Sequence, residues 1–302
     1  MRQASRVYHR PVEAKVATAN QEAVEAWDGV LFDRFSKYRH LILPGNGAHS
    51  DRALALHPPQ PGERVLDVGC GFGDVTQQIA AMVGPEGEVV GVDASPRFID
   101  AAGAEASEAG VANVRFEVAD VEAGGFGGGF DRVFSRFGTM FFANPVRALR
   151  NVHEALVPGG ELCMVVWRQK AENPWMYEAQ LAVERYLERR ENPDEPTCGP
   201  GPFSMANADT TTGILVSAGY EDIRLDRTNT QITIGHDLDE AIELVTAIGP
   251  AGEIIRLAGE DAEEIRPKLI EAVRGALERF SGPDGVCAQM STWAVIARAP
   301  AG

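Results

Sequence analysis

The sequence is poor in several features that would assign a protein to a specialised class. It holds only four cysteines in 302 residues, Cys70, Cys163, Cys198 and Cys287. Their wide spacing forms neither a metal-ligand motif nor a redox pair. No apolar run approaches the roughly 20 residues that a membrane-spanning helix needs, and no apolar block follows the basic residues at the N-terminus. We therefore expect a cytoplasmic protein with reduced cysteines and no metal site.

Positive charge is also scarce. Lysine and arginine total 28 against 44 aspartates and glutamates, which gives a formal charge of −16. A surface this acidic repels phosphate backbones and anionic membranes. We expect neither nucleic acid nor a membrane as partner. A small-molecule substrate fits better, and a homodimer is compatible with the sequence.

Short apolar runs alternate with helical segments in the first half of the chain. The runs are Arg64–Val68, Glu88–Asp93, Val114–Ala119, Asp131–Phe137 and Glu161–Trp167. Most are rich in valine, as strands covered on both faces are, whereas Val114–Ala119 alternates and suits a strand nearer the sheet edge. Helices are expected to begin near Gly73, Pro96 and Asn144. This order predicts an α/β fold with a mostly parallel, doubly wound, Rossmann-like sheet.

The remaining segments are expected to surround this sheet. Residues 1–57 would form an N-terminal helical lid, interrupted at Leu43–Gly47, and residues 58–168 the cofactor-binding core. A lid insertion would follow at 169–209, with an amphipathic helix over Trp175–Glu188. Residues 210–302 would complete the core with two short strands, at Ile223–Asp226 and Gln231–Ile234, an acidic helical insertion at 237–282, and a closing strand at Met290–Arg298.

A glycine-rich turn follows the first predicted strand. Gly69, Gly71 and Gly73 stand at alternate positions, so the backbone can bend sharply and approach a ligand closely. A dinucleotide-binding turn needs its third glycine one residue later, where this chain has Asp74. Asp67 and Asp74 would repel a diphosphate. Asp67 instead suits a ligand that carries a cationic amino group.

Two further carboxylates stand at the ends of the next two predicted strands. Asp93 can accept hydrogen bonds from both hydroxyls of a ribose, and Asp120 can accept one from an adenine amino group, with a backbone N–H offered by Val121. Singly, each aspartate could be a helix cap or a turn residue. With Asp67, they favour a nucleoside site at the carboxyl edge of the sheet.

The chain resembles the class I S-adenosylmethionine-dependent methyltransferases, in particular the small-molecule branch related to the ubiquinone/menaquinone methyltransferases. The matching segments are Val65–Gly73, Val90–Ser95, Ala119–Val121, Phe130–Phe137 and Leu156–Leu162. They lie within residues 62–167, about a third of the 302 residues. The resemblance implies a seven-stranded sheet whose last strand is antiparallel and lies beside the fifth. It implies S-adenosyl-L-methionine as the cofactor.

The resemblance also implies roles for individual residues. The methionine part of the cofactor would face Asp67, Gly69, Cys70, Gly71 and Gly73, the ribose Asp93 and Ala94, and the adenine Asp120 and Val121. Arg136 and Phe137 would line the methyl-transfer site, and Tyr38 and Arg39 would cover the cofactor from the lid.

No general base is assigned, because positioning and exclusion of water dominate methyl transfer. His40, His236 and Arg136 are the candidates. Aromatic residues such as Trp167 and Trp175 favour an apolar or aromatic acceptor, methylated on O, N or C. Three alternatives stay open: a nucleotide-dependent oxidoreductase, a non-catalytic S-adenosylmethionine-binding partner subunit, and a peptide or protein methyltransferase.

Overall fold

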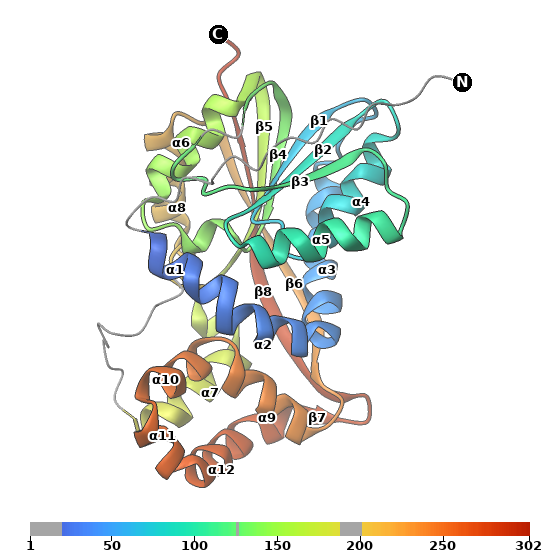
Figure 1. Ribbon diagram of the computed structural model, residues 1–302. Coiled ribbons are helices and arrows are strands. Elements are labelled where there is room, and N and C mark those ends of the chain that lie inside the picture. Colours follow the sequence, from blue (N-terminus) through green and yellow to red (C-terminus); the bar gives the residue numbers. More distant parts are fainter. Residues whose placement is uncertain (1–19, 125–126, 188–200) are drawn as a thin grey trace.

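One mixed sheet forms the centre of the upper part of the protein (Figure 1). The computed structural model describes residues 20–124, 127–187 and 201–302. The strands are β1 (Arg64–Val68), β2 (Glu88–Asp93), β3 (Val114–Val118), β4 (Phe130–Arg136), β5 (Leu156–Trp167), β6 (Glu221–Gly235), β7 (Ser281–Gly282) and β8 (Gly285–Arg298). Their order is β3-β2-β1-β4-β5-β8-β6, with β7 paired to β8.

The sheet confirms the expected doubly wound α/β fold. Strands β1 to β5 are parallel. β8 is antiparallel and lies between β5 and β6, as the resemblance implied. β3 is at the edge, where its alternating pattern placed it. The expectation of seven strands was wrong by one, because the two-residue β7 forms a short antiparallel pair with β8.

Helices cover both faces of the sheet and extend beyond it. They are α1 (Gln21–Ala26), α2 (Phe32–Lys37), α3 (Arg39–Leu56), α4 (Asp74–Val83), α5 (Pro96–Glu108), α6 (Pro145–Ala155), α7 (Pro174–Glu184), α8 (Ala208–Ala218), α9 (Leu238–Ala247), α10 (Pro250–Ala258), α11 (Glu260–Glu264) and α12 (Arg266–Leu277). A π-helical turn, η2 (Trp27–Leu31), joins α1 to α2. Helices α3 and α4 pack on one face of the sheet, and α6 and α8 on the other. No helix in the described ranges is long and apolar enough to span a membrane.

The predicted interruption at Leu43–Gly47 was wrong, because helix α3 runs through it with Pro44 inside. A proline within a helix costs about 3 kcal/mol, so packing must stabilise this segment. Gly45 lies against β6, and a Cβ on it would come within 3.2 Å of Ile232. Further along the helix, Ala53 and Leu54 are buried in the core. Tertiary packing therefore outweighs local propensity here.

Two predicted strand boundaries in the C-terminal part of the chain were also wrong. The two short strands expected at 223–226 and 231–234 are one long strand, β6, because its polar middle is paired throughout with β8. The closing strand begins at Gly285 rather than at Met290. β6 and β8 therefore extend below the sheet as a two-stranded ribbon (Figure 1). The helix expected over Trp175–Glu188 is observed as α7 and ends at Glu184.

A second hydrophobic core lies below the sheet, at the end of this ribbon (Figure 1). Helix α7, from the first predicted insertion, packs against α10 and α12, from the second. Trp175 and Met176 of α7 are buried there with Leu269 and Val273 of α12. The two insertions thus form a single helical layer.

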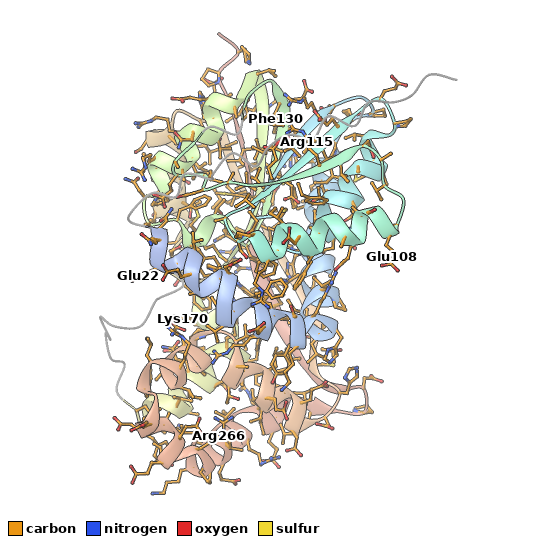
Figure 2. All side chains as sticks on the ribbon, in the orientation of Figure 1. Glu22, Glu108, Arg115, Phe130, Lys170 and Arg266 are labelled. Atoms are coloured by element: carbon orange, nitrogen blue, oxygen red, sulfur yellow. The ribbon has the colours of Figure 1, made fainter. Side chains whose placement is uncertain are left out.

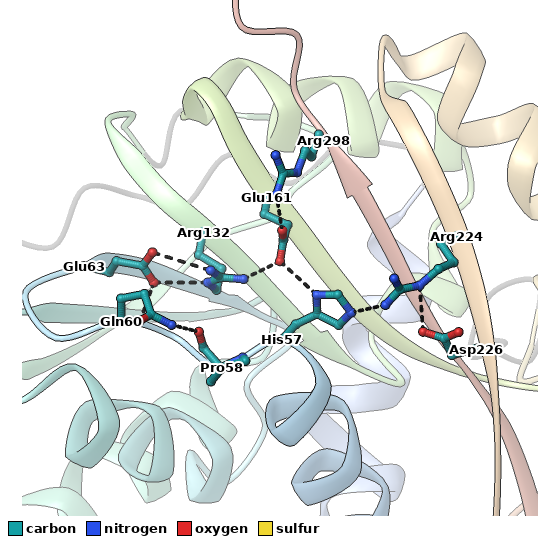
Figure 3. A network of polar contacts seen from close by, with 9 residues as sticks. All are labelled: His57, Pro58, Gln60, Glu63, Arg132, Glu161, Arg224, Asp226 and Arg298. Atoms are coloured by element: carbon teal, nitrogen blue, oxygen red, sulfur yellow. Dashed lines mark hydrogen bonds and ion pairs between the residues drawn. The ribbon is translucent and has the colours of Figure 1, made fainter.

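A polar network lies around the first residues of β1 and β4, away from their carboxyl ends (Figure 3). Glu161 of β5 forms ion pairs with Arg132 and Arg298, and its carboxylate is 3.3 Å from His57 Nδ1. Arg132 also pairs with Glu63. These contacts join β4, β5 and β8 to the segment that enters β1.

Candidate functional site

The turn after β1 has the left-handed backbone that its glycines permit. Gly69, Gly71 and Gly73 have φ values of 68°, 54° and 74°. A Cβ on Gly69 would lie 3.0 Å from Gly138 Cα, so the turn is pressed against the end of β4. A Cβ on Gly71 would meet nothing within 4 Å. The turn therefore leaves open space at Gly71, where a ligand can approach the backbone.

Asp67 lies beneath this turn. Its side chain is 2% exposed and accepts a hydrogen bond of 2.6 Å from the Thr76 hydroxyl. Burial raises the pKa of Asp67 to about 7. Burial also raises the pKa of the Cys70 thiol within the turn, which keeps that thiol neutral.

Asp93 joins the end of β2 to the glycine turn. One carboxylate oxygen accepts a hydrogen bond of 3.1 Å from the Gly71 N–H, and the other accepts one of 3.0 Å from the Ser95 N–H. Burial raises the pKa of Asp93. The sequence placed Asp93 and Gly71 at neighbouring strand ends, and the structure brings them into contact.

Asp120 follows β3 and meets a residue that the sequence reasoning missed. Its Oδ1 accepts hydrogen bonds from Asn20 Nδ2, at 3.0 Å, and from the Glu122 N–H, at 2.9 Å. Asn20 is 7% exposed, and within the described ranges its own Oδ1 has no hydrogen-bond partner. Val121 is buried beside it. No local pattern marks Asn20, because its partner lies 100 residues away.

Arg136 forms a bidentate ion pair with Asp74. The two nitrogen–oxygen distances are 2.7 and 3.0 Å, and the guanidinium lies 3.3 Å from the Ser50 hydroxyl. Arg136 therefore compensates the charge of Asp74, whereas the prediction that Asp74 repels a diphosphate treated this charge as free. This pair joins the end of β4 to the start of α4 and to the lid helix α3.

The N-terminal helices pack over the carboxyl ends of the strands (Figures 1 and 2). Asp28 of η2 accepts hydrogen bonds from the Ser95 hydroxyl, at 2.7 Å, and from the Arg97 N–H, at 2.9 Å. The Trp27 ring lies 4.9 Å from that of Phe141. Nothing in the local sequence signalled these contacts of Asp28, because its partners lie 67 and 69 residues away.

Aromatic side chains gather beyond the ends of β4 and β5. Phe137 has a φ of 62°, which is rare for a residue other than glycine. Its ring is stacked on that of Trp167 at 5.0 Å, and the rings of Trp175 and Phe203 each lie 6.3 Å from Trp167. Lys170, labelled in Figure 2, lies over Phe203. We call Phe137, Trp167, Trp175 and Phe203 the aromatic wall.

The predicted lid residues Tyr38 and Arg39 lie at the start of helix α3. The guanidinium of Arg39 pairs with Glu105 and lies 4.3 Å from the centre of the Phe72 ring. Tyr38 is buried in the second core, with its hydroxyl 3.2 Å from Glu243. His40 and His236 lie side by side on the surface, their ring centres 6.0 Å apart.

Two surface hollows lie elsewhere on the protein. One, of about 350 Å³, follows the polar face of β6 and β8 and is lined in part by Asn229, Gln231 and Gln289. The other, of about 380 Å³, lies near Gly84 and Asn113 at the far end of α4. Neither includes a strand-end carboxylate. The convergence of charged and backbone groups, not hollow volume, therefore marks the site.

Comparisons with known proteins agree with this geometry. The chain is 38% identical over 112 residues to aklanonic acid methyltransferase of Streptomyces sp. (strain C5), covering 37% of this chain and 51% of that protein. It is 39% identical over 123 residues to the ubiquinone/menaquinone biosynthesis C-methyltransferase of Ectopseudomonas mendocina, covering 40% and 48%. The chain thus spans about half the length of these relatives.

Solved structures share the fold. The YcgJ protein of Bacillus subtilis matches 84% of this chain and 100% of its own, with a TM-score of 0.54 and 18% identity. A putative methyltransferase of Bacillus halodurans gives a TM-score of 0.53, also at 18% identity, over 84% of this chain and 99% of its own. The model of the family described as "methyltransferase domain" matches residues 59–212, half of the chain. The chain therefore belongs to the methyltransferase domain family and has the class I fold.

Proposed function

We propose that the protein is an S-adenosyl-L-methionine-dependent methyltransferase that acts on a small apolar or aromatic molecule. One observation carries this proposal: Asp67, Asp93 and Asp120 stand at the ends of β1, β2 and β3, around a glycine turn that is open at Gly71. The curated relatives act on small molecules according to their names, which supports a small-molecule acceptor.

The residues present fit this cofactor. The open space at Gly71 is a cradle that a Cβ would enter. Asp93 borders it through its bond to the Gly71 N–H and can accept hydrogen bonds from ribose hydroxyls. Beside Asp120, the buried Asn20 Oδ1 has no partner within the described ranges. An adenine amino group offers the donor that this oxygen needs.

Bound S-adenosylmethionine would supply a sulfonium methyl group, which the acceptor atom takes with its own electron pair while the sulfur keeps the pair of the broken bond. The protein itself would orient the cofactor and the acceptor and exclude water from them. The ion pair of Arg136 with Asp74 fixes the loop beyond β4 against α4. The N-terminal helices cover the strand ends (Figure 1), where they would shield the bound cofactor from water.

The aromatic wall supports an apolar or aromatic acceptor. Phe137 follows the end of β4 and Trp167 is the last residue of β5, and their stacked rings offer a flat apolar surface. His40 and His236 both pair with Glu240 on the surface. Within the described ranges, neither contacts the aromatic wall. We therefore assign them no catalytic role.

A panel assay tests this function. The protein is incubated with methyl-labelled S-adenosylmethionine and flat aromatic, quinone and small acidic acceptors, and the products are separated by mass. We expect transfer to an aromatic or quinone acceptor, and a large loss in Trp167→Ala. Binding of S-adenosylhomocysteine without transfer to any acceptor would favour the non-catalytic partner. Transfer only to peptides would contradict the small-molecule assignment.

A further inference from the structure

Three side chains from two distant segments of the chain meet on the surface where α3 and α9 adjoin. His40 Nε2 lies 2.8 Å from Glu240 Oε1, and His236 Nδ1 lies 2.7 Å from Glu240 Oε2. The two imidazole rings are parallel within 2°. The ligand atoms of all three residues lie within 4.8 Å of one another. His40 is 200 residues from Glu240, so the fold, not local sequence, makes this cluster.

Two imidazoles and one carboxylate form a donor set that divalent transition metals prefer. Zn²⁺ binds imidazole nitrogen and carboxylate oxygen at about 2.0–2.2 Å, with water in a fourth position. Tetrahedral ligands at that distance are about 3.4 Å apart. The observed cluster reaches this spacing by small side-chain rotations, which the exposure of both histidines permits.

The surroundings of the cluster favour a cation. The backbone N–H of His236 donates to Glu240 at 2.7 Å, which holds the carboxylate beside the two imidazoles. Asp237 and Asp239 lie with Glu240 at the N-terminal end of α9, and the whole chain carries a charge of −16. Such a field concentrates divalent cations.

The position of Glu240 is also fixed by the fold. Asp237 caps α9 by accepting a hydrogen bond from the Glu240 N–H at 2.9 Å. Glu240 is thus held both at its backbone N–H and at its carboxylate, while His40 approaches the carboxylate from the lid. A metal here would join α3, which carries the lid, to α9 of the helical layer.

We propose that His40, His236 and Glu240 form a binding site for one divalent transition metal ion, best matched by Zn²⁺, that fastens the lid helix α3 to α9. This site is separate from the strand-end carboxylates. It holds its ion whether or not the proposed methyl transfer occurs. The proposal departs from the sequence-based expectation that the chain has no metal site.

Calorimetric titration with Zn²⁺ tests the site on the tag-free, chelator-treated full chain at neutral pH. We expect one Zn²⁺ per chain. His40→Ala and His236→Ala should each weaken binding by more than about tenfold, since even residues outside the ligand set change metal affinity by that factor. Glu243→Gln, one turn further along α9, is the matched control and should bind Zn²⁺ as the unmodified chain does.

Two further readouts separate this site from incidental binding. Zn²⁺ should raise the melting temperature of the unmodified chain and of Glu243→Gln but not that of His40→Ala, because only a ligand bound to the folded state stabilises it. Co²⁺ should give visible absorption bands that His236→Ala loses. Absence of Zn²⁺ binding, or equal binding in both histidine variants, would overturn the proposal. The three residues would then form only a hydrogen-bonded bridge between α3 and α9.

Discussion

Replacing Gly71 with alanine separates close approach of a ligand from backbone strain. Gly71 has a φ of 54°, and its added Cβ would meet no atom within 4 Å. The left-handed backbone costs an alanine about 1 kcal/mol, so Gly71→Ala should fold and melt roughly 2–4 °C lower. The Cβ would stand in the space beside Asp93. Filling a fitted contact costs about 1–3 kcal/mol, so S-adenosylhomocysteine should bind roughly 5- to 150-fold more weakly.

Gly110→Ala is the matched control. Gly110 follows α5, has a φ of 70° and is also surrounded by open space. It should lose about the same 1 kcal/mol of stability and keep its affinity for S-adenosylhomocysteine. Calorimetric titration and thermal melting of both variants give the two quantities. Unchanged affinity in Gly71→Ala, or an equal loss in Gly110→Ala, would refute the close-approach argument.

Three further predictions concern charged groups. Asp93→Ala should weaken binding of S-adenosylhomocysteine by about 1–3 kcal/mol in calorimetry, because ribose hydroxyls lose a charged acceptor. Burial raises the pKa of Asp67 from 3.8 to about 7, so folding favours its protonated form. This contribution is complete below pH 3.8 and is lost as pH rises through about 7. Relative to Asp67→Asn, the free energy of unfolding of the unmodified chain should therefore fall by up to about 4 kcal/mol over that range. Denaturant unfolding at several pH values measures it, and a constant difference in free energy between the two proteins would contradict the prediction. Glu161→Gln should cost roughly 1–3 kcal/mol of stability, because Arg132 and Arg298 lose their shared anion. It should leave the affinity for S-adenosylhomocysteine unchanged. A loss of affinity would mean that the network in Figure 3 acts on the strand-end site.

The strands and their terminal carboxylates could be predicted because both depend on local sequence. An apolar run followed by glycine or aspartate marks a buried strand and its end, and parallel strands bring such ends to one edge. Asp67 and Asp93 are therefore observed where the pattern predicted them.

Contacts between distant segments could not be predicted in this way. The partner of Arg136 is Asp74, 62 residues away, and the sequence gives no register between them. Helix α3 continues through Pro44 at a place where it packs against β6, which is distant in the sequence. The contact between His40 and Glu240 could not be predicted for the same reason. The two residues are 200 positions apart and meet only because α9, which follows β6, packs beside the lid helix α3.

Calorimetric titration with S-adenosylhomocysteine and, separately, with NAD tests the assignment of the strand-end site most directly. One S-adenosylhomocysteine should bind per chain, more weakly in Asp93→Ala, and NAD should give no measurable heat of binding. Binding of NAD, or S-adenosylhomocysteine affinity that is unchanged in Asp93→Ala, would contradict an S-adenosylmethionine site at the strand ends.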